Sequence, residues 1–307
     1  MTEITADEVR TGWRDYYELC KPNVVFLMLL TAVIGMLMAT PNAVPLDVLF
    51  FGNVGIGLCA ASAAVVNHIV DQKIDLIMRR THNRPIAQGR IDNLHALMFA
   101  LVLGIAGMGL LIITINQLTA WLTLLSLVGY AAIYTLFLKR ATPQNIVIGG
   151  LAGAAPPLLG WTAVTGEIGG HGLLLVLIIF AWTPPHFWAL AIHRREDYAK
   201  VGVPMLPVTH GVKYTALQTL LYTLILFAVA LLPFATGMSG PLYLIGAVVL
   251  GLVFIVYAIN IMRNKPGAPM ATFRFSIIYL MALFMVMLLD HYLFPIRSVF
   301  EVVPYAG

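Results

Sequence analysis

The stretch "FFGNVGIGLCAASAAVVNHIVDQKID" occupies residues 50–75 and decides how the chain is organised. Its first part, residues 50–66, carries no charged side chain, and an apolar run of about 20 residues is long enough to cross a bilayer as a helix. Asn67, Asp71 and Asp75 then follow at intervals of four residues. Side chains four apart lie on one face of a helix. We therefore expect a membrane helix that continues past the membrane edge and carries a polar stripe there.

The composition of the whole chain agrees with a membrane protein. Of its 307 residues, 60% are hydrophobic and 10% are charged, and its mean hydropathy is +0.89. A soluble domain carries roughly 25% charged residues. The expected fold class is an all-α integral membrane protein with nine transmembrane helices, because the chain shows no strand-like alternation. The predicted spans are 22–40, 48–66, 94–115, 118–138, 146–165, 172–191, 214–235, 241–262 and 275–294.

Basic residues predict the orientation of these spans. With the N-terminus in the cytoplasm, all but one of the 18 Lys and Arg residues fall in cytoplasmic segments, and only Arg297 lies outside. Such a one-sided distribution follows the positive-inside rule. The same rule accounts for the net charge of +4 without a nucleic-acid partner. We expect a cytoplasmic N-terminus and an external C-terminus.

The N-terminal segment indicates the compartment. Residues 1–20 contain five acidic side chains, and a mitochondrial presequence is poor in acids, whereas a signal peptide needs an apolar core near its start. We expect the inner (cytoplasmic) membrane of a bacterium, with the active site facing the cytoplasm.

The two cysteines form no CxxC pattern, which disfavours a disulfide or a cysteine metal site. The expected domains are a cytoplasmic segment 1–21, one transmembrane domain 22–294 and an external tail 295–307.

The polar stripe has the residue types of a metal–diphosphate site. Two carboxylates and an amide oxygen are ligands that Mg²⁺ takes together with substrate phosphate oxygens. Arg79, Arg80 and Arg84 follow the stripe and suit bidentate phosphate contacts. The competing interpretation is a solvated helix end whose acids balance its bases.

At a membrane edge below an apolar interior, the favoured ligand is a polyprenyl diphosphate, whose ionisation gives a cation that aromatic faces stabilise. Four aromatic residues in the spans are candidates for this role: Trp161, Trp182, Phe187 and Trp188.

Two proline pairs interrupt neighbouring spans. Pro156-Pro157 and Pro184-Pro185 remove backbone donors, which a membrane tolerates where the helix faces protein or a wet cavity. We expect either plain kinked helices or a cavity lined by spans 146–165 and 172–191. Gly149 and Gly153 form a GxxxG pattern that favours close helix packing.

The motif "NHIVDQKID" resembles the NxxxDxxxD motif of the UbiA superfamily of intramembrane prenyltransferases. That resemblance covers essentially the whole chain and implies nine transmembrane helices with cytoplasmic active-site loops. Four further segments resemble the haem-farnesylating members of the family: "RRTHNRPIAQGRI", "APPLLGW", "WTPPHFWALAIHRREDYAKVGVPMLPVTHG" and "LLDHYLFP".

The resemblance implies a reaction and its partners. An Mg²⁺-dependent transferase would move a farnesyl group from farnesyl diphosphate to the 2-vinyl group of haem b, and water would complete the addition to give haem O and diphosphate. Haem is then a substrate rather than a cofactor. A haem A synthase or terminal oxidase assembly would use the product.

The resemblance also assigns roles to individual residues. Asn67, Asp71 and Asp75 would hold Mg²⁺ and diphosphate, with Arg79 and Arg84 on the phosphates. Many family members carry a second DxxxD after the sixth span, but this chain has adjacent Glu196 and Asp197 there. A second metal held by two carboxylates is therefore in doubt. The remaining candidates are Arg195 and Lys200 for phosphates or haem propionates, Asp197 and Tyr198 in the second loop, His186 and His193 for haem, and His68 and His82 beside the metal ligands.

Two other functions remain open from the residues. One is a UbiA-type enzyme that prenylates an aromatic quinone precursor, and the other is a non-catalytic protein such as a transporter or a haem-binding assembly factor. A transporter places ionisable residues near the membrane midplane. Here they gather at one edge, and Asp290 and His291 at the far end of the last span are expected to be structural.

Overall fold

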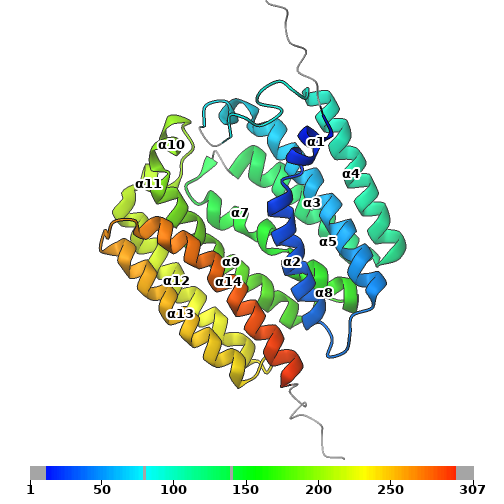
Figure 1. Cartoon of the computed structure of the whole chain (residues 1–307), viewed down its shortest axis with the longest axis vertical. Coiled ribbons are helices and arrows are strands. Elements are labelled where there is room, and N and C mark those ends of the chain that lie inside the picture. Colours follow the sequence, from blue (N-terminus) through cyan, green and yellow to red (C-terminus); the bar gives the residue numbers. More distant parts are fainter. Residues whose placement is uncertain (1–11, 79–80, 139–140, 295–307) are drawn as a thin grey trace, which may run out of the picture.

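The computed structural model describes residues 12–78, 81–138 and 141–294, and every regular element in these ranges is a helix (Figure 1). The helices of the N-terminal half are α1 (Trp13–Leu19), α2 (Pro22–Met38), α3 (Leu46–Asp75), α4 (Asn93–Thr114), α5 (Gln117–Val128), the π-helix η1 (Gly129–Leu138) and α7 (Asn145–Ala154). Those of the C-terminal half are α8 (Pro156–Thr165), α9 (Gly170–His193), α10 (Arg195–Lys200), α11 (Leu206–Thr209), α12 (Gly211–Ala235), α13 (Pro241–Met262) and α14 (Ala268–Leu293).

The expectation of an all-helical, multi-pass membrane protein is confirmed, but the count of nine is not. Within the described ranges, seven segments are long and apolar enough to span a membrane, with α7 and α8 counted as one. An eighth exists if α1 and α2, which meet at 51°, form one broken span. The predicted span 118–138 is divided into the 12-residue α5 and the 10-residue η1. The orientation of the bundle stays a prediction.

The helices form two groups that meet in the middle of the molecule. Helices α2, α3, α4, α5 and α8 share one buried cluster, and α9, α12, α13 and α14 share another. Figure 1 shows the first group in blue to green on one side and α12 to α14 in yellow to orange on the other. Helix α9 packs against α7, α8, α12 and α14, so it joins the two groups.

Two glycines allow α2 and α8 to pack backbone against backbone. A Cβ at Gly35 would lie 1.9 Å from the carbonyl oxygen of Pro157, and one at Gly160 would lie 1.9 Å from that of Ala32. The predicted GxxxG pair behaves differently. Gly149 lies against the Tyr134 ring, as close packing requires, whereas no atom of the described residues lies within 4 Å of a Cβ at Gly153, so only one of the two glycines is used for close packing.

The proline pairs have different consequences. The first pair begins α8 directly after α7 ends at Ala154, because proline fits the first turn of a helix. The second pair, Pro184-Pro185, lies within α9, which continues through it to His193.

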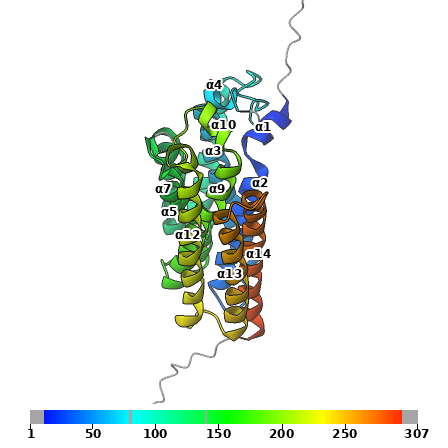
Figure 2. The same ribbon diagram turned by 90° about the vertical axis from the view of Figure 1, so that its left-hand side faces the viewer.

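The polar connections gather at one end of the bundle. Helices α3 and α9 both end there, and α1, α10 and α11 lie at that same end (Figures 1 and 2). The opposite end carries the α12–α13 turn and the end of α14 (Figure 1). The two ends can therefore be compared as separate chemical environments.

Candidate active site

The polar stripe lies in the last turns of α3. The helix continues through Asp75, as predicted, and Asn67, Asp71 and Asp75 are 4%, 3% and 3% exposed. Asn67 Nδ2 donates to Asp71 Oδ2 at 3.0 Å, a contact that the four-residue spacing allows. A solvated helix end would leave these side chains exposed, so the burial disfavours that interpretation.

Two cations from outside α3 contact the stripe. Arg84 Nη1 donates to Asp75 Oδ2 at 2.7 Å, and Lys21 Nζ donates to Asn67 Oδ1. Lys21 lies at the break between α1 and α2 with a left-handed φ of 49°, an uncommon conformation for a residue other than glycine. Arg84 was predicted from the sequence as a phosphate ligand, whereas Lys21 was not predicted. The only local indication for Lys21 is its position directly before Pro22. Arg79 and Arg80 lie outside the described residues.

The π-helix η1 approaches the stripe from another side. Asn67 Nδ2 also donates to Thr135 Oγ1 at 3.5 Å, and Tyr130 and Tyr134 of η1 stack with ring centroids 5.5 Å apart. π-Helical turns occur frequently at functional sites. The sequence reasoning missed these tyrosines and named four other aromatic residues. All four have ring partners elsewhere. Trp161 meets His171 edge-on, Trp182 and Phe187 contact His186, and Trp188 meets Tyr222 edge-on.

A cleft of about 400 Å³ opens beside the stripe. Its lining comes from α1, the start of α2, α3 and the segment after α3: Tyr17, Glu18, Lys21, Pro22, Asn23, Val24, His68 and Arg84. Lys21 and Arg84 thus contact both the stripe and the cleft. A ligand in the cleft would lie within reach of both cations.

The donor atoms of the stripe fit a hard cation. Among the described residues, no group of three or more His, Cys, Asp and Glu side chains is placed to hold a metal, so a site would rest on two carboxylates and the Asn67 amide oxygen. Mg²⁺ is commonly bound through one or two carboxylates plus substrate phosphates. The side-chain oxygens of Asn67 and Asp75 are held by Lys21 and Arg84, flexible cations that can move to a bound anion when the oxygens take a metal.

The second loop is attached to the stripe end through an apolar cluster. Ile74 in the last turn of α3 and Met78 just after the helix pack with Val203, Met205 and Leu206, and Tyr198 packs against this cluster. Of the other predicted residues of α10, Arg195 and Lys200 are exposed and Asp197 is half-buried. The structure thus places the loop beside the stripe, while the roles of its charged residues stay predictions.

The haem candidates have contrasting surroundings. His186 is buried between the rings of Trp182 and Phe273, at centroid distances of 4.1 and 4.6 Å, and its Nδ1 lies 2.7 Å from Ser276 Oγ. These contacts are those of a packed histidine with one nitrogen engaged, and haem ligation by it stays a prediction. His193 is exposed at the end of α9, and His82 is exposed after α3.

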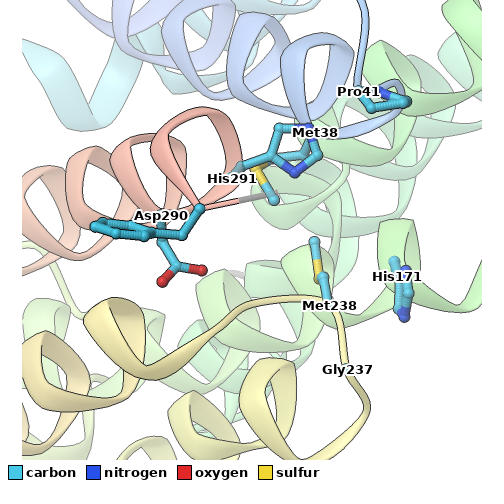
Figure 3. Close-up of a pocket in the computed structure, with 8 residues that line it drawn as sticks. Met38, Pro41, His171, Gly237, Met238, Asp290 and His291 are labelled. Carbon is cyan, nitrogen blue, oxygen red and sulfur yellow. The ribbon is translucent and has the colours of Figure 1, made fainter. Parts of the chain in front are cut away.

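The opposite end of the bundle holds a smaller cavity, about 170 Å³ in volume (Figure 3). The buried carboxylate of Asp290 points from α14 toward the α12–α13 turn, where it accepts hydrogen bonds from the backbone N–H groups of Gly240 and, at 3.1 Å, Tyr243. His291 Nε2 lies 3.0 Å from the carbonyl oxygen of Thr40. These contacts cap α13 and join neighbouring segments, which agrees with the structural role expected for both residues.

Comparison with known proteins decides the family. The UbiA prenyltransferase family matches residues 28–289. The chain belongs to the UbiA prenyltransferase family. A relative from Saccharophagus degradans, named protoheme IX farnesyltransferase, is 69% identical over 94% of this chain and 95% of its own length. One of the same name from Marinobacter nauticus is 67% identical over 92% of this chain and 94% of its own length.

Solved structures of UbiA proteins share the fold. A chain from work on digeranylgeranylglyceryl phosphate synthase superposes with a TM-score of 0.78 at 19% identity, over 91% of this chain and 98% of that one. A UbiA homologue from Archaeoglobus fulgidus, bound to GPP and Mg²⁺, gives a TM-score of 0.62 at 17% identity, over 89% and 99% of the two chains. At these identities the likeness shows the UbiA fold alone.

Proposed function

We propose that this chain is an Mg²⁺-dependent transferase that moves a farnesyl group from farnesyl diphosphate to the 2-vinyl group of haem b. The products are haem O and diphosphate. Relatives at 62–69% identity over almost the whole chain carry the name of this activity. The structural observation that carries the proposal is a buried stripe of two carboxylates and an amide with two cations beside it.

The stripe and its cations suit the leaving group. Asn67, Asp71 and Asp75 would hold Mg²⁺, which when bound neutralises charge on the diphosphate. Arg84 would contact phosphate oxygens through charge-assisted hydrogen bonds. Arg79, Arg195 and Lys200 are further candidates for the phosphates, and Asp197 and Tyr198 for organising the second loop.

The bond changes balance with water as the third reactant. The C1–O bond of farnesyl diphosphate breaks and the electron pair leaves with diphosphate. The terminal carbon of the haem vinyl group then bonds to the allylic C1, which moves the positive charge to the carbon next to the porphyrin ring. Water adds there and loses a proton, giving the hydroxyethylfarnesyl side chain. The stacked rings of Tyr130 and Tyr134 offer π faces to the allylic cation.

The proposed setting is the bacterial cytoplasmic membrane. Nine transmembrane segments result if α1–α2 and α5–η1 each count as a span, and the positive-inside pattern then directs the stripe toward the cytoplasm. The product would pass to a haem A synthase or to a terminal oxidase.

The test is an assay of the purified protein with haem b, farnesyl diphosphate and Mg²⁺, with EDTA as the control. Haem extracts are analysed by liquid chromatography and mass spectrometry. We expect a haem heavier by one farnesyl group and one hydroxyl group, formed only with Mg²⁺. If diphosphate is released while haem is unchanged, the acceptor is another molecule, such as an aromatic quinone precursor. If haem stays bound and no diphosphate is released, the chain is a haem-binding protein and the proposal is wrong.

A further inference from the structure

His68 is a buried polar side chain at the edge of the cleft. It is 2% exposed and lines the 400 Å³ cleft, and neither ring nitrogen has a hydrogen-bond partner among the described residues. Buried polar groups in native proteins almost always have a partner, because an unsatisfied one costs free energy. An imidazole of this kind at a cleft indicates a ligand that completes its hydrogen bonds.

His68 lies on a different side of α3 from the polar stripe. Consecutive residues of a helix lie about 100° apart around its axis, so His68 does not share the face of Asn67 and Asp71. It lines the cleft together with Tyr17 and Pro22 of the α1–α2 segment. A group bound by His68 therefore meets α3 from the flank of the stripe.

The charges around the cleft favour an anion. Lys21 and Arg84 line it, and Glu18, the acidic residue among the described lining residues, lies 3.8 Å from Arg90 outside the cleft. A neutral imidazole can donate an N–H bond to a carboxylate there without adding a third positive charge. Tyr17, Pro22 and Val24 provide an apolar rim next to these polar groups.

We propose that this cleft binds a propionate carboxylate of the acceptor haem, with His68 donating a hydrogen bond and Lys21 providing the charge. The proposal rests on the proposed function, since it locates the acceptor of that reaction. Propionate suits the site better than diphosphate because the metal-binding oxygens are on another face of α3. The apolar rim suits the edge of a flat porphyrin from which a carboxylate extends.

The test compares binding of haem b with binding of its dimethyl ester, in which both propionates are neutral. Each is titrated into the full-length protein without farnesyl diphosphate, and the Soret band is followed. The variants are His68→Ala, His68→Gln, which keeps a donor, and His95→Ala, an exposed histidine at the same end as the control. A hydrogen bond to a charged group is worth enough to change affinity by about tenfold.

We expect His68→Ala to weaken haem b binding by about tenfold and to leave ester binding unchanged. His68→Gln should restore most of the lost affinity, and His95→Ala should match the wild type. If acid and ester weaken equally, His68 only supports packing and the proposal is wrong. If haem binding is unchanged while binding of farnesyl diphosphate with Mg²⁺ weakens, the cleft serves the diphosphate instead, which also overturns it. A wild type that shows the expected selectivity but makes no haem O would contradict the proposed function and leave this site standing.

Discussion

The two ends of the bundle each hold buried carboxylates, and their partners differ. Asp71 and Asp75 are both 3% exposed and Asp290 is 1% exposed. Asp290 accepts from two backbone N–H groups at the start of α13, which are fixed parts of the chain. Asp75 is paired with the side chain of Arg84, which can move away. Burial alone therefore does not identify a reactive carboxylate; the freedom of its partners to move does.

The largest effect is expected from Asp71→Asn or Asp75→Asn. Either change removes a charged oxygen donor while it keeps the shape of the side chain, so haem O formation should fall at least about a hundredfold. The thermal unfolding midpoint in detergent should change little, because the stripe lies at the edge of the bundle. Liquid chromatography with mass spectrometry measures the first quantity, and a melting curve the second. Turnover at the wild-type rate in either variant would refute the metal assignment.

The reverse outcome is expected from Asp290→Asn. The loss of charge weakens two hydrogen bonds at the start of α13, which should lower the free energy of unfolding by about 2 kcal/mol. Haem O formation well below the melting temperature should stay within about twofold of the wild type. A large loss of activity without a loss of stability would show that the two ends are not distinct in role.

An intermediate effect is expected from Arg84→Gln. Its charge-assisted contact to a phosphate should be lost, so KM for farnesyl diphosphate should rise by about tenfold. Arg90→Gln is the matched control, because Arg90 lies in the same segment but pairs with Asp15 at 3.0 Å. Steady-state kinetics at saturating haem measure both variants. Equal KM changes in the two variants would show that Arg84 does not bind the diphosphate.

The smallest effect is expected at an exposed carboxylate that caps a helix as Asp290 does. The backbone N–H of His95 donates to Asp92 at 2.8 Å and lowers the pKa of that carboxyl. Because the pKa of Asp92 is lower in the folded state than in the unfolded state, the charged cap stabilises the fold above the unfolded-state pKa. This stabilisation is lost as pH falls through the folded-state pKa. Asp92→Asn keeps a capping oxygen without a charge. The melting temperature of this variant should therefore fall less on acidification than that of the wild type. An unchanged pH profile would assign no stability to this cap.

The sequence predicted the part of the site that lies on one helix. The spacing of Asn67, Asp71 and Asp75 gave their shared stripe, because helical periodicity is local. Lys21 is 46 residues from its partner Asn67, and a contact over that distance leaves no periodic signal in the chain. Nor do the residues of η1 differ in composition from an α-helix, which is why the division of span 118–138 was not predicted.

Contacts between helices far apart in the sequence are equally hard to predict from the chain alone. The contacts of Gly35 and Gly160 across α2 and α8 depend on how two helices meet, whereas the predicted Gly149–Gly153 pair followed only a spacing rule. Spacing rules identified residues able to pack closely, and the tertiary fold determined which of them do.

The most direct test of the contrast between the two ends is divalent-metal binding. Mn²⁺ substitutes for Mg²⁺ and can be titrated by electron paramagnetic resonance in the presence of farnesyl diphosphate, with wild type, Asp71→Asn and Asp290→Asn measured in parallel. We predict equal Mn²⁺ affinity for wild type and Asp290→Asn, and a loss of at least about tenfold for Asp71→Asn. Unchanged affinity in Asp71→Asn, or a comparable loss in a folded Asp290→Asn, would contradict the account.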